Sequence, residues 1–170
     1  MKAVVQRVID ASVTVNGVLK GAVSFGLLVY LGVAREDTPH DADWLAEKIV
    51  HLRIFDDSDD KMNLSLVDLV TQYDDTANIP GVNQINKKVN TVPLGVLAIS
   101  QFTLLGDARK GRRPSWEKAA PPEKARELYC YFMQKISEKA PCESGEFQAR
   151  MKVNYTNDGP VTIILDSKGD

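Results

Sequence analysis

The chain has 170 residues, of which 44% are hydrophobic and 26% charged, and these values are typical of one globular domain with a sizeable core. The formal net charge of −2 argues against binding nucleic acid through overall charge. The chain contains no apolar run of the roughly 20 residues that a membrane helix needs, and its N-terminus lacks the layout of a signal peptide. We therefore expect a cytoplasmic protein without a membrane partner.

The N-terminal part of the chain predicts strands. Residues 2–9 and 12–15 are rich in β-branched and apolar side chains, and Asn16-Gly17 is a strong hairpin-turn signal that leads to a strand over residues 18–23. Residues 27–33 form a short, continuous apolar run, which is typical of a strand buried on both faces.

A first amphipathic helix is predicted over residues 39–52, because Thr38 can cap it and apolar side chains follow at helical spacing. Residues 53–55 resume as a strand, and the acidic residues 56–60 form a turn that lacks the glycine and glutamate of a calcium loop. Residues 70–94 show weak periodicity and form an atypically long connection for a compact domain.

The second half of the chain begins with its strongest strand pattern, over residues 96–105. A second main helix is predicted over residues 121–140, and two last strands over residues 150–155 and 161–166. Together, the elements predict one strand-rich α+β domain over residues 1–170, with two main helices packed on a mostly antiparallel sheet or an open barrel.

The usual catalytic signatures are absent. The sequence holds no G-x-S-x-G elbow, no H-E-x-x-H and no glycine-rich phosphate loop, and its two histidines, His40 and His51, do not suggest a Ser-His-Asp triad. Two cysteines make neither a zinc site nor a disulfide framework, so we expect no metal and no cofactor. An enzyme with this sequence would depend on positioning and on backbone dipoles.

Two segments break local rules, which is typical of functional sites. Residues 100–103, Ser-Gln-Phe-Thr, place three polar side chains in an otherwise apolar strand. A period of two would send Gln101 and Thr103 to one face of the sheet and the other two side chains to the opposite face. In Asn157-Asp158-Gly159-Pro160, the proline opens a strong strand although it cannot donate to a sheet ladder. The alternatives are a strand that emerges into solvent and an ordinary turn.

A basic cluster lies between these segments, with four cations in five residues: Arg109, Lys110, Arg112 and Arg113. Such a cluster can hold phosphates on a protein whose net charge is negative. A solvated surface run is the alternative interpretation, and composition alone favours it.

Eight segments spread over nearly the whole chain carry a family resemblance: MKAVVQRV (1–8), ASVTV (11–15), GLLVYLGV (26–33), ADWLAEKIVHLRIF (42–55), KMNLS (61–65), SQFTLL (100–105), RKGRRPSW (109–116) and NDGPVT (157–162). They resemble those of the D-aminoacyl-tRNA deacylase family, and SQFT followed by NDGPVT is highly specific for it. The chain departs from the family pattern at 70–94, which is longer than the usual link, at Leu105-Gly106, where Tyr-Ala is common, and at Trp116, where Phe is common.

The resemblance implies hydrolysis of the ester bond of D-aminoacyl-tRNA, and of glycyl-tRNA mischarged on tRNA-Ala, with rejection of L-aminoacyl-tRNA. It implies a homodimer whose active site lies at the subunit interface, where a cis Gly159-Pro160 bond of one subunit reaches into the pocket of the other. Rigid backbone carbonyl groups there would leave no room for an L side chain. Arg7, Met151 and Asn157 would support this site, and Arg7 would hold the Gly-Pro loop.

The resemblance also places the catalytic site at Ser100, Gln101, Phe102 and Thr103. Backbone N–H groups of Phe102 and Thr103 would stabilise the oxyanion, the Phe102 ring would pack on the terminal adenosine, and the ribose 2′-hydroxyl would assist the attack. In a rival mechanism Thr103 is a covalent nucleophile. The basic cluster would contact phosphates of the acceptor end. Two other functions stay open: a non-catalytic RNA-binding module and a small-molecule esterase.

Overall fold

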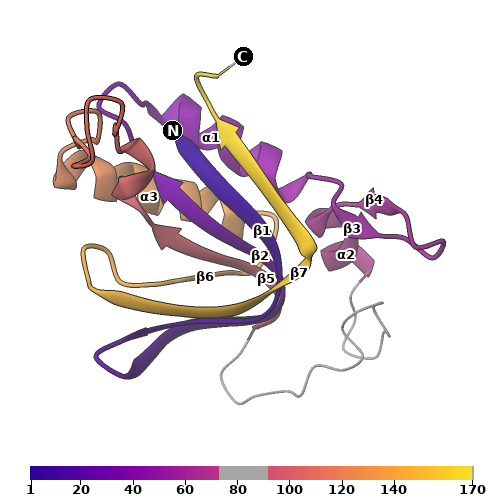
Figure 1. Ribbon diagram of the computed structural model, residues 1–170. Helices are drawn as coiled ribbons and strands as arrows, with labels where there is room; N and C mark the ends of the chain where they lie inside the picture. The colour runs from indigo at the N-terminus through magenta and orange to yellow at the C-terminus, as the bar shows by residue number, and fades with distance from the viewer. Residues whose placement is uncertain (73–91, 170) are drawn as a thin grey trace.

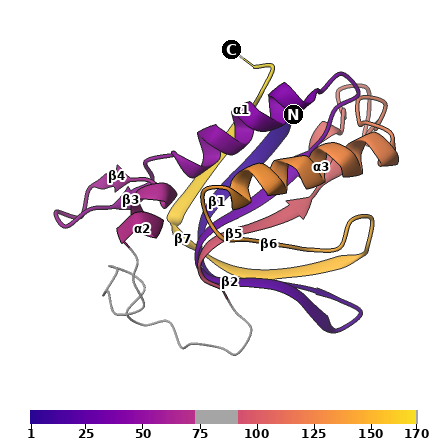
Figure 2. The same cartoon turned by 180° about the vertical axis from the view of Figure 1, so that it is seen from behind.

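The computed structural model describes residues 1–72 and 92–169, which fold around one five-stranded sheet (Figure 1, Figure 2). The strands, in their order across the sheet, are β6 (Cys142–Ser144), β5 (Val92–Ser100), β2 (Val18–Gly32), β1 (Lys2–Val15) and β7 (Met151–Asp166). Two main helices, α1 (Pro39–Val50) and α3 (Pro122–Ser137), lie together on one face of the sheet. A smaller unit follows α1 and comprises β3 (Phe55–Asp56), β4 (Met62–Leu64) and helix α2 (Leu66–Gln72). Within the described ranges, no helix has both the length and the apolar character needed to cross a bilayer.

The sheet is mixed because its strands are connected in two ways. β1 and β2 are joined by Asn16-Gly17, whose φ angles of 51° and 80° suit a tight hairpin turn, so these strands pair antiparallel. β7 also pairs antiparallel with β1. β5 follows a long crossover that includes α1 and pairs parallel with β2, and β6 pairs parallel with β5. The structure confirms the α+β class with two main helices, on a sheet that combines both kinds of pairing.

The main core lies between the sheet and the two helices. Alternate residues of β1, such as Val5, point to this face, and helical spacing brings Leu45 of α1 and Phe132 of α3 to the same cluster. All three side chains are fully buried. Helix α1 begins where its cap is expected, because the backbone N–H of Thr38 donates to the Asp41 carboxylate at 2.8 Å.

The other face of the sheet is covered in part by the sheet itself. β1, β2 and β7 are long strands that bend, so that their distal halves curl over this outer face (Figure 1). The bend of β1 coincides with Asp10, whose φ is 55°, and with shifts of register against β7. The predicted strands over 2–9 and 12–15 are therefore one bent strand. The curl encloses a second apolar cluster, formed by Val8, Ala11, Val13, Val23, Leu28, Leu97 and Ile99.

The strand predicted over residues 96–105 ends at Ser100, and η1 (Phe102–Leu105) is a 3-10 helix. The predicted alternation of side chains beyond Ser100 is therefore wrong. The cause is the neighbouring strand, because β2 ends at Gly32 and the N–H of Gln101 makes a last ladder bond to the Leu31 carbonyl at 2.8 Å. Beyond that point the backbone satisfies its hydrogen bonds locally, as a helical turn.

The predicted strands over 150–155 and 161–166 are parts of one strand, β7, which continues through Gly159-Pro160. A proline is tolerated there because β7 lies at the edge of the sheet and has one ladder partner. Of the long connection predicted at about 70–94, residues 73–91 lie outside the described residues. Helix α2, which ends at Gln72, is not indicated by the sequence pattern.

Candidate active site

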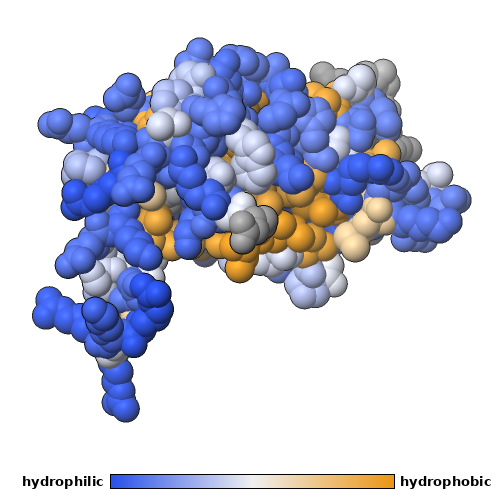
Figure 3. All heavy atoms as spheres, turned by 90° about the horizontal axis from the view of Figure 1, so that it is seen from above, coloured by the Kyte–Doolittle hydropathy of each residue, from blue (hydrophilic) through white to orange (hydrophobic). Residues whose placement is uncertain are grey.

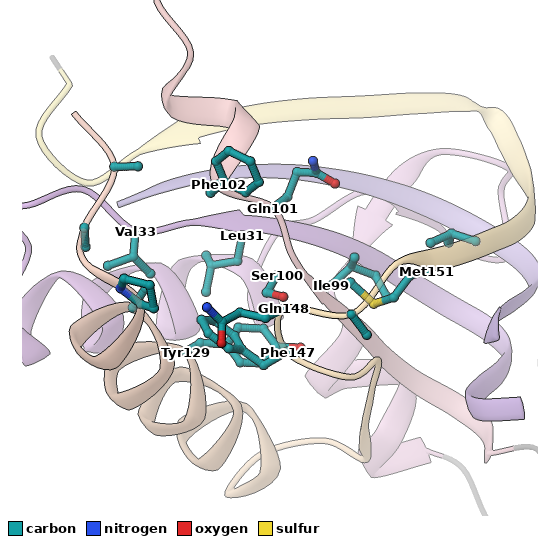
Figure 4. Close-up of a pocket in the computed structure, with 16 residues that line it drawn as sticks. Leu31, Val33, Ile99, Ser100, Gln101, Phe102, Tyr129, Phe147, Gln148 and Met151 are labelled. Carbon is teal, nitrogen blue, oxygen red and sulfur yellow. The ribbon is translucent and has the colours of Figure 1, made fainter. Parts of the chain in front are cut away.

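A cavity of about 610 Å³ opens between the end of β5, helix α3 and the segment 145–150 that leads into β7 (Figure 4). Its lining is mostly apolar, and alanines such as Ala120 keep it open next to α3. The cavity brings together four of the predicted site residues: Ser100, Gln101, Phe102 and Met151. Ligand sites are often apolar cavities of this size with a few convergent polar groups.

The backbone changes direction at the mouth of the cavity, between β5 and η1. The first residues of a helix have N–H groups without an acceptor inside the helix, and here these belong to Phe102 and Thr103. The Phe102 ring is 58% exposed and packs edge-to-face on Trp116, with ring centroids 5.2 Å apart. Thr103 lies outside the cavity lining, and its hydroxyl accepts a hydrogen bond from the side-chain amide of Gln101.

The far wall of the cavity comes from residues that the sequence analysis did not single out. Tyr129 of α3 is buried, and its hydroxyl donates to the Ala98 carbonyl at 2.9 Å. Burial raises the pKa of Tyr129, so the phenol stays protonated and remains a donor at physiological pH. Phe147 packs against Tyr129, with ring centroids 5.9 Å apart, and Gln148 follows with a left-handed φ of 63°. These contacts join segments that are distant in the chain. Among the sequence features, only the Ala119-Ala120 run before α3 could have indicated this wall of the cavity.

Gly159 and Pro160 lie on β7, outside the cavity lining, and are joined by a cis peptide bond. The side-chain amide of Asn157 donates to the carbonyl groups of Arg7 and Val161, at 3.0 Å each, and ties the segment to β1. The structure thus brings Asn157 and Arg7 to the Gly-Pro segment but leaves this segment apart from the cavity of the same chain.

The guanidinium of Arg7 is buried behind the Gly-Pro segment, with 8% of its side chain exposed. Its Nη1 donates to the Ile54 carbonyl at 2.8 Å and lies 3.2 Å from a carboxylate oxygen of Asp56. Its Nε lies 2.7 Å from a carboxylate oxygen of Asp158, in an ion pair that is not aligned as a hydrogen bond. A buried cation is energetically costly unless it is paired. The Asp158 carboxylate is such a partner for Arg7, so the position of the Gly-Pro segment is coupled to that of Arg7.

The basic cluster lies on a loop closed by Asp107 and Ser115, whose backbone groups exchange two hydrogen bonds of 2.9 Å. Arg109 is engaged within the loop, because its Nε donates to the Asp107 carboxylate at 2.9 Å, and its hydrogen bonds lower the pKa of Asp107. The other three cations are exposed and have no carboxylate partner in the described part of the chain. None of the four lines the cavity.

Fold and cavity together define an α+β domain with an apolar pocket that is lined by Phe102, the first residue of η1. In residues 1–72 and 92–169, no group of acidic, histidine and cysteine side chains is arranged to hold a metal ion. Backbone donors beside an apolar pocket suit the stabilisation of an oxyanion, as in the cleavage of an acyl ester.

Comparison with known proteins identifies the family. The family model described as D-Tyr-tRNA(Tyr) deacylase matches residues 4–73 and 75–166. The D-aminoacyl-tRNA deacylase of Kosmotoga olearia is 50% identical over 168 residues, which cover 99% of this chain and 98% of that protein. The D-aminoacyl-tRNA deacylase of Koribacter versatilis is 52% identical over 169 residues, with the same coverage. The chain belongs to the D-Tyr-tRNA(Tyr) deacylase family, a family of hydrolases, and the resemblance drawn from the sequence motifs is confirmed.

Solved structures share the fold. The c-Myc DNA unwinding element binding protein superposes with a TM-score of 0.80 at 36% identity, covering 99% of this chain and 100% of that one. A probable eukaryotic D-amino acid tRNA deacylase superposes with a TM-score of 0.68 at 16% identity, covering 96% and 97% of the two chains. The second likeness shows the fold alone.

Proposed function

We propose that this protein hydrolyses the ester bond of D-aminoacyl-tRNA, and of glycyl-tRNA mischarged on tRNA-Ala, in the cytoplasm, and that it rejects L-aminoacyl-tRNA. The observation that carries the proposal is the apolar cavity lined by Phe102, where η1 begins with the N–H groups of Phe102 and Thr103, in a member of a deacylase family. These donors would bind the oxyanion of the tetrahedral intermediate. One such donor contributes about 2.7–4 kcal/mol in a well-studied protease.

The proposed nucleophile is water. His40 and His51 lie outside the cavity lining, and Nδ1 of His51 is 3.3 Å from the Glu47 carboxylate, so neither histidine serves as a base there. The Thr103 hydroxyl is held by the Gln101 side chain. Water adds to the ester carbonyl carbon with help from the neighbouring ribose 2′-hydroxyl. The bond to the ribose 3′-oxygen then breaks, and this oxygen takes a proton as the free tRNA leaves.

Gly159 and Pro160 are the proposed filter for chirality. Both residues are exposed, and their segment is braced by Arg7, Asn157 and Asp158, yet it lies outside the cavity of its own chain. A second subunit would place this segment over the cavity. Backbone carbonyl groups held there would exclude an L side chain, whereas a D side chain points elsewhere and glycine has none, so selection works by rejection.

An uncovered apolar surface supports the homodimer that this filter requires. Ile164 of β7 is 75% exposed on the outer face of the sheet, where its strand neighbour is Val4, followed across the sheet by Tyr30. Figure 3 shows apolar surface open to solvent between polar regions on the face seen from above. Large exposed apolar patches mark interaction sites, because removing apolar surface from water on association is favourable in free energy.

The test is incubation with matched D- and L-aminoacyl-tRNA and with glycyl-tRNA, followed by measurement of the released amino acid. We expect release from the D and glycyl substrates while the L substrate stays largely intact. Equal rates on the two enantiomers would contradict the proposal. Binding without release would favour a non-catalytic RNA-binding module, and cleavage of simple esters alone would favour a small-molecule esterase that uses Thr103.

A matched pair of variants tests the bracing of the filter. Asp158→Asn removes a partner of the buried Arg7, whereas Asp166→Asn removes an ion pair with Lys2 elsewhere on β7. We expect Asp158→Asn to raise the rate on the L substrate relative to the D substrate, and Asp166→Asn to leave this ratio unchanged. The same ratio in both variants would show that the filter does not depend on Arg7 and Asp158.

A further inference from the structure

Arg126 of α3 is not part of the cavity lining, but it contacts Phe147, which is. Its guanidinium carbon is 5.4 Å from the centroid of the Phe147 ring, and Phe147 lines the cavity together with Ala125 and Tyr129 from the same helix as Arg126. The ring face attracts the cation and restricts the orientations of its planar group. Arg126 itself is exposed, so the guanidinium is held in place on one side and open to solvent on the other.

Arg126 has no anionic partner among the residues that the structure describes. In the described part of the chain, no carboxylate lies within ion-pair distance of Arg126 and no hydrogen-bond acceptor is engaged by it. Glu146, next to Phe147, is instead paired with Lys20 at 2.9 Å. Another cation of this helix, Lys124, donates to the Arg35 carbonyl at 2.5 Å. Arg126 therefore keeps its donors free beside the cavity, unlike Arg109 of the basic cluster.

The chemistry of the proposed substrate limits what Arg126 can bind. In an aminoacyl ester the α-carboxyl group is esterified and the amino group is cationic, so the anions near the ester that all such substrates share are phosphodiesters. The planar fork of a guanidinium matches two phosphate oxygens. We infer that Arg126 binds the phosphodiester that joins the terminal nucleotide of the tRNA to the one before it. This inference rests on the proposed function and adds a subsite to the same cavity.

The subsite contributes to binding and takes no part in the chemical step. Two substrates separate these effects: D-phenylalanyl-tRNA, and 3′-O-(D-phenylalanyl)adenosine, which has no phosphate. We expect Arg126→Gln to raise KM for the tRNA about tenfold, as removal of one charge-assisted hydrogen bond does, with kcat little changed. The adenosine ester should be cleaved with wild-type KM and kcat. Arg126→Lys keeps the charge but lacks the planar fork of the guanidinium. Its KM for the tRNA should therefore lie between those of the wild type and Arg126→Gln.

Lys135→Gln is the matched control. Lys135 lies on the same helix, 5.6 Å from the Tyr131 ring centroid, but Tyr131 does not line the cavity. This variant should leave both substrates unaffected. Equal impairment of tRNA and adenosine ester in Arg126→Gln would assign Arg126 a structural role in the cavity wall and overturn the inference. An unchanged KM for the tRNA would overturn it as well.

A binding measurement keeps this inference separate from the proposed function. The probe is the trinucleotide CCA carrying a 3′-amide-linked D-phenylalanine, which is not cleaved, titrated against each variant at several salt concentrations. Arg126→Gln should weaken binding and reduce the slope of log affinity against log salt, because one salt-dependent phosphate contact is lost. If the wild type cleaves neither ester, the proposed function fails, and this titration still decides the role of Arg126. An unchanged slope would refute that role.

Discussion

The Thr103 hydroxyl accepts a hydrogen bond from Gln101 and lies outside the cavity lining, whereas the N–H group of the same residue stands at the start of η1. The backbone donor survives replacement of the side chain. We therefore expect Thr103→Ala to keep turnover of D-aminoacyl-tRNA within about tenfold of wild type, whereas loss of a covalent nucleophile costs about 10⁶ in a serine protease. Single-turnover rates measure this directly.

The companion measurement uses a substrate whose terminal ribose lacks the 2′-hydroxyl. This substrate should be cleaved far more slowly than the natural one by both wild type and Thr103→Ala. Loss of all activity in Thr103→Ala, with fold and tRNA binding intact, would establish the covalent mechanism instead. A trapped threonyl ester would do the same.

Gly106 and Trp116 are two of the positions where the chain departs from its family pattern, and they are in contact. A Cβ atom on Gly106 would lie 2.6 Å from Cζ3 of the Trp116 ring, which is too close for two carbon atoms. Gly106 has a φ of −64°, which any residue adopts, so the main obstacle to a side chain is this ring, and the carbonyl oxygen of Thr103, 3.0 Å from the same Cβ, is a second close contact. The absence of a side chain at Gly106 therefore makes room for the ring of Trp116.

A double-mutant cycle tests this fit. We expect Gly106→Ala to lower the free energy of unfolding by about 1–3 kcal/mol, as overpacking does. In the Trp116→Phe background the same change should cost much less, because the smaller ring leaves room. Urea unfolding of the four proteins gives the coupling energy. Additive effects would show that the ring yields without cost and that the two positions are independent.

At the scale of elements, the loop between Asp107 and Ser115 carries the basic cluster, which lies outside the cavity lining. We expect joint replacement of Lys110, Arg112 and Arg113 by Gln to weaken tRNA binding and to flatten its salt dependence, by about 0.7–0.9 in log–log slope for each phosphate that the variant no longer binds. Arg109→Gln should have a smaller effect, because Arg109 is already paired with Asp107. Filter binding at several salt concentrations measures both. An unchanged slope in the triple variant would show that these residues bind no phosphate and form a solvated surface run.

At the scale of the whole molecule, the Gly-Pro segment lies outside the cavity lining of its own chain, so the proposed site, in which this segment covers the cavity, requires two chains. We expect Ile164→Glu, which places a charge on the uncovered face of the sheet, to shift the protein to monomers in light scattering and to lower activity in parallel. Trp44→Glu is the control, because Trp44 is 41% exposed on α1, which covers the opposite face. A fully active monomer would contradict the shared site.

Much of the fold could be predicted because it depends on local signals. The Asn16-Gly17 turn, the cap of α1 at Thr38 and the apolar face of α3 each act within a few residues, and each lies where the sequence places it. The end of β5 could not be predicted in this way. Leu104 and Leu105 extend the strand pattern past the polar side chains of residues 100–103, but the neighbouring strand β2 stops at Gly32, and a strand without a partner cannot satisfy its backbone.

By itself, the sequence determined the α+β class, the two main helices and, through its SQFT and NDGPVT segments, the family. Only the tertiary structure decided what surrounds those segments. Tyr129 and Phe147 reach the cavity from distant parts of the chain, Arg126 is held over Phe147, and Asp158 meets a buried Arg7. The physical reason is range: caps and turns are set by neighbours in sequence, whereas a cavity and a buried ion pair exist only where packing brings separate elements together.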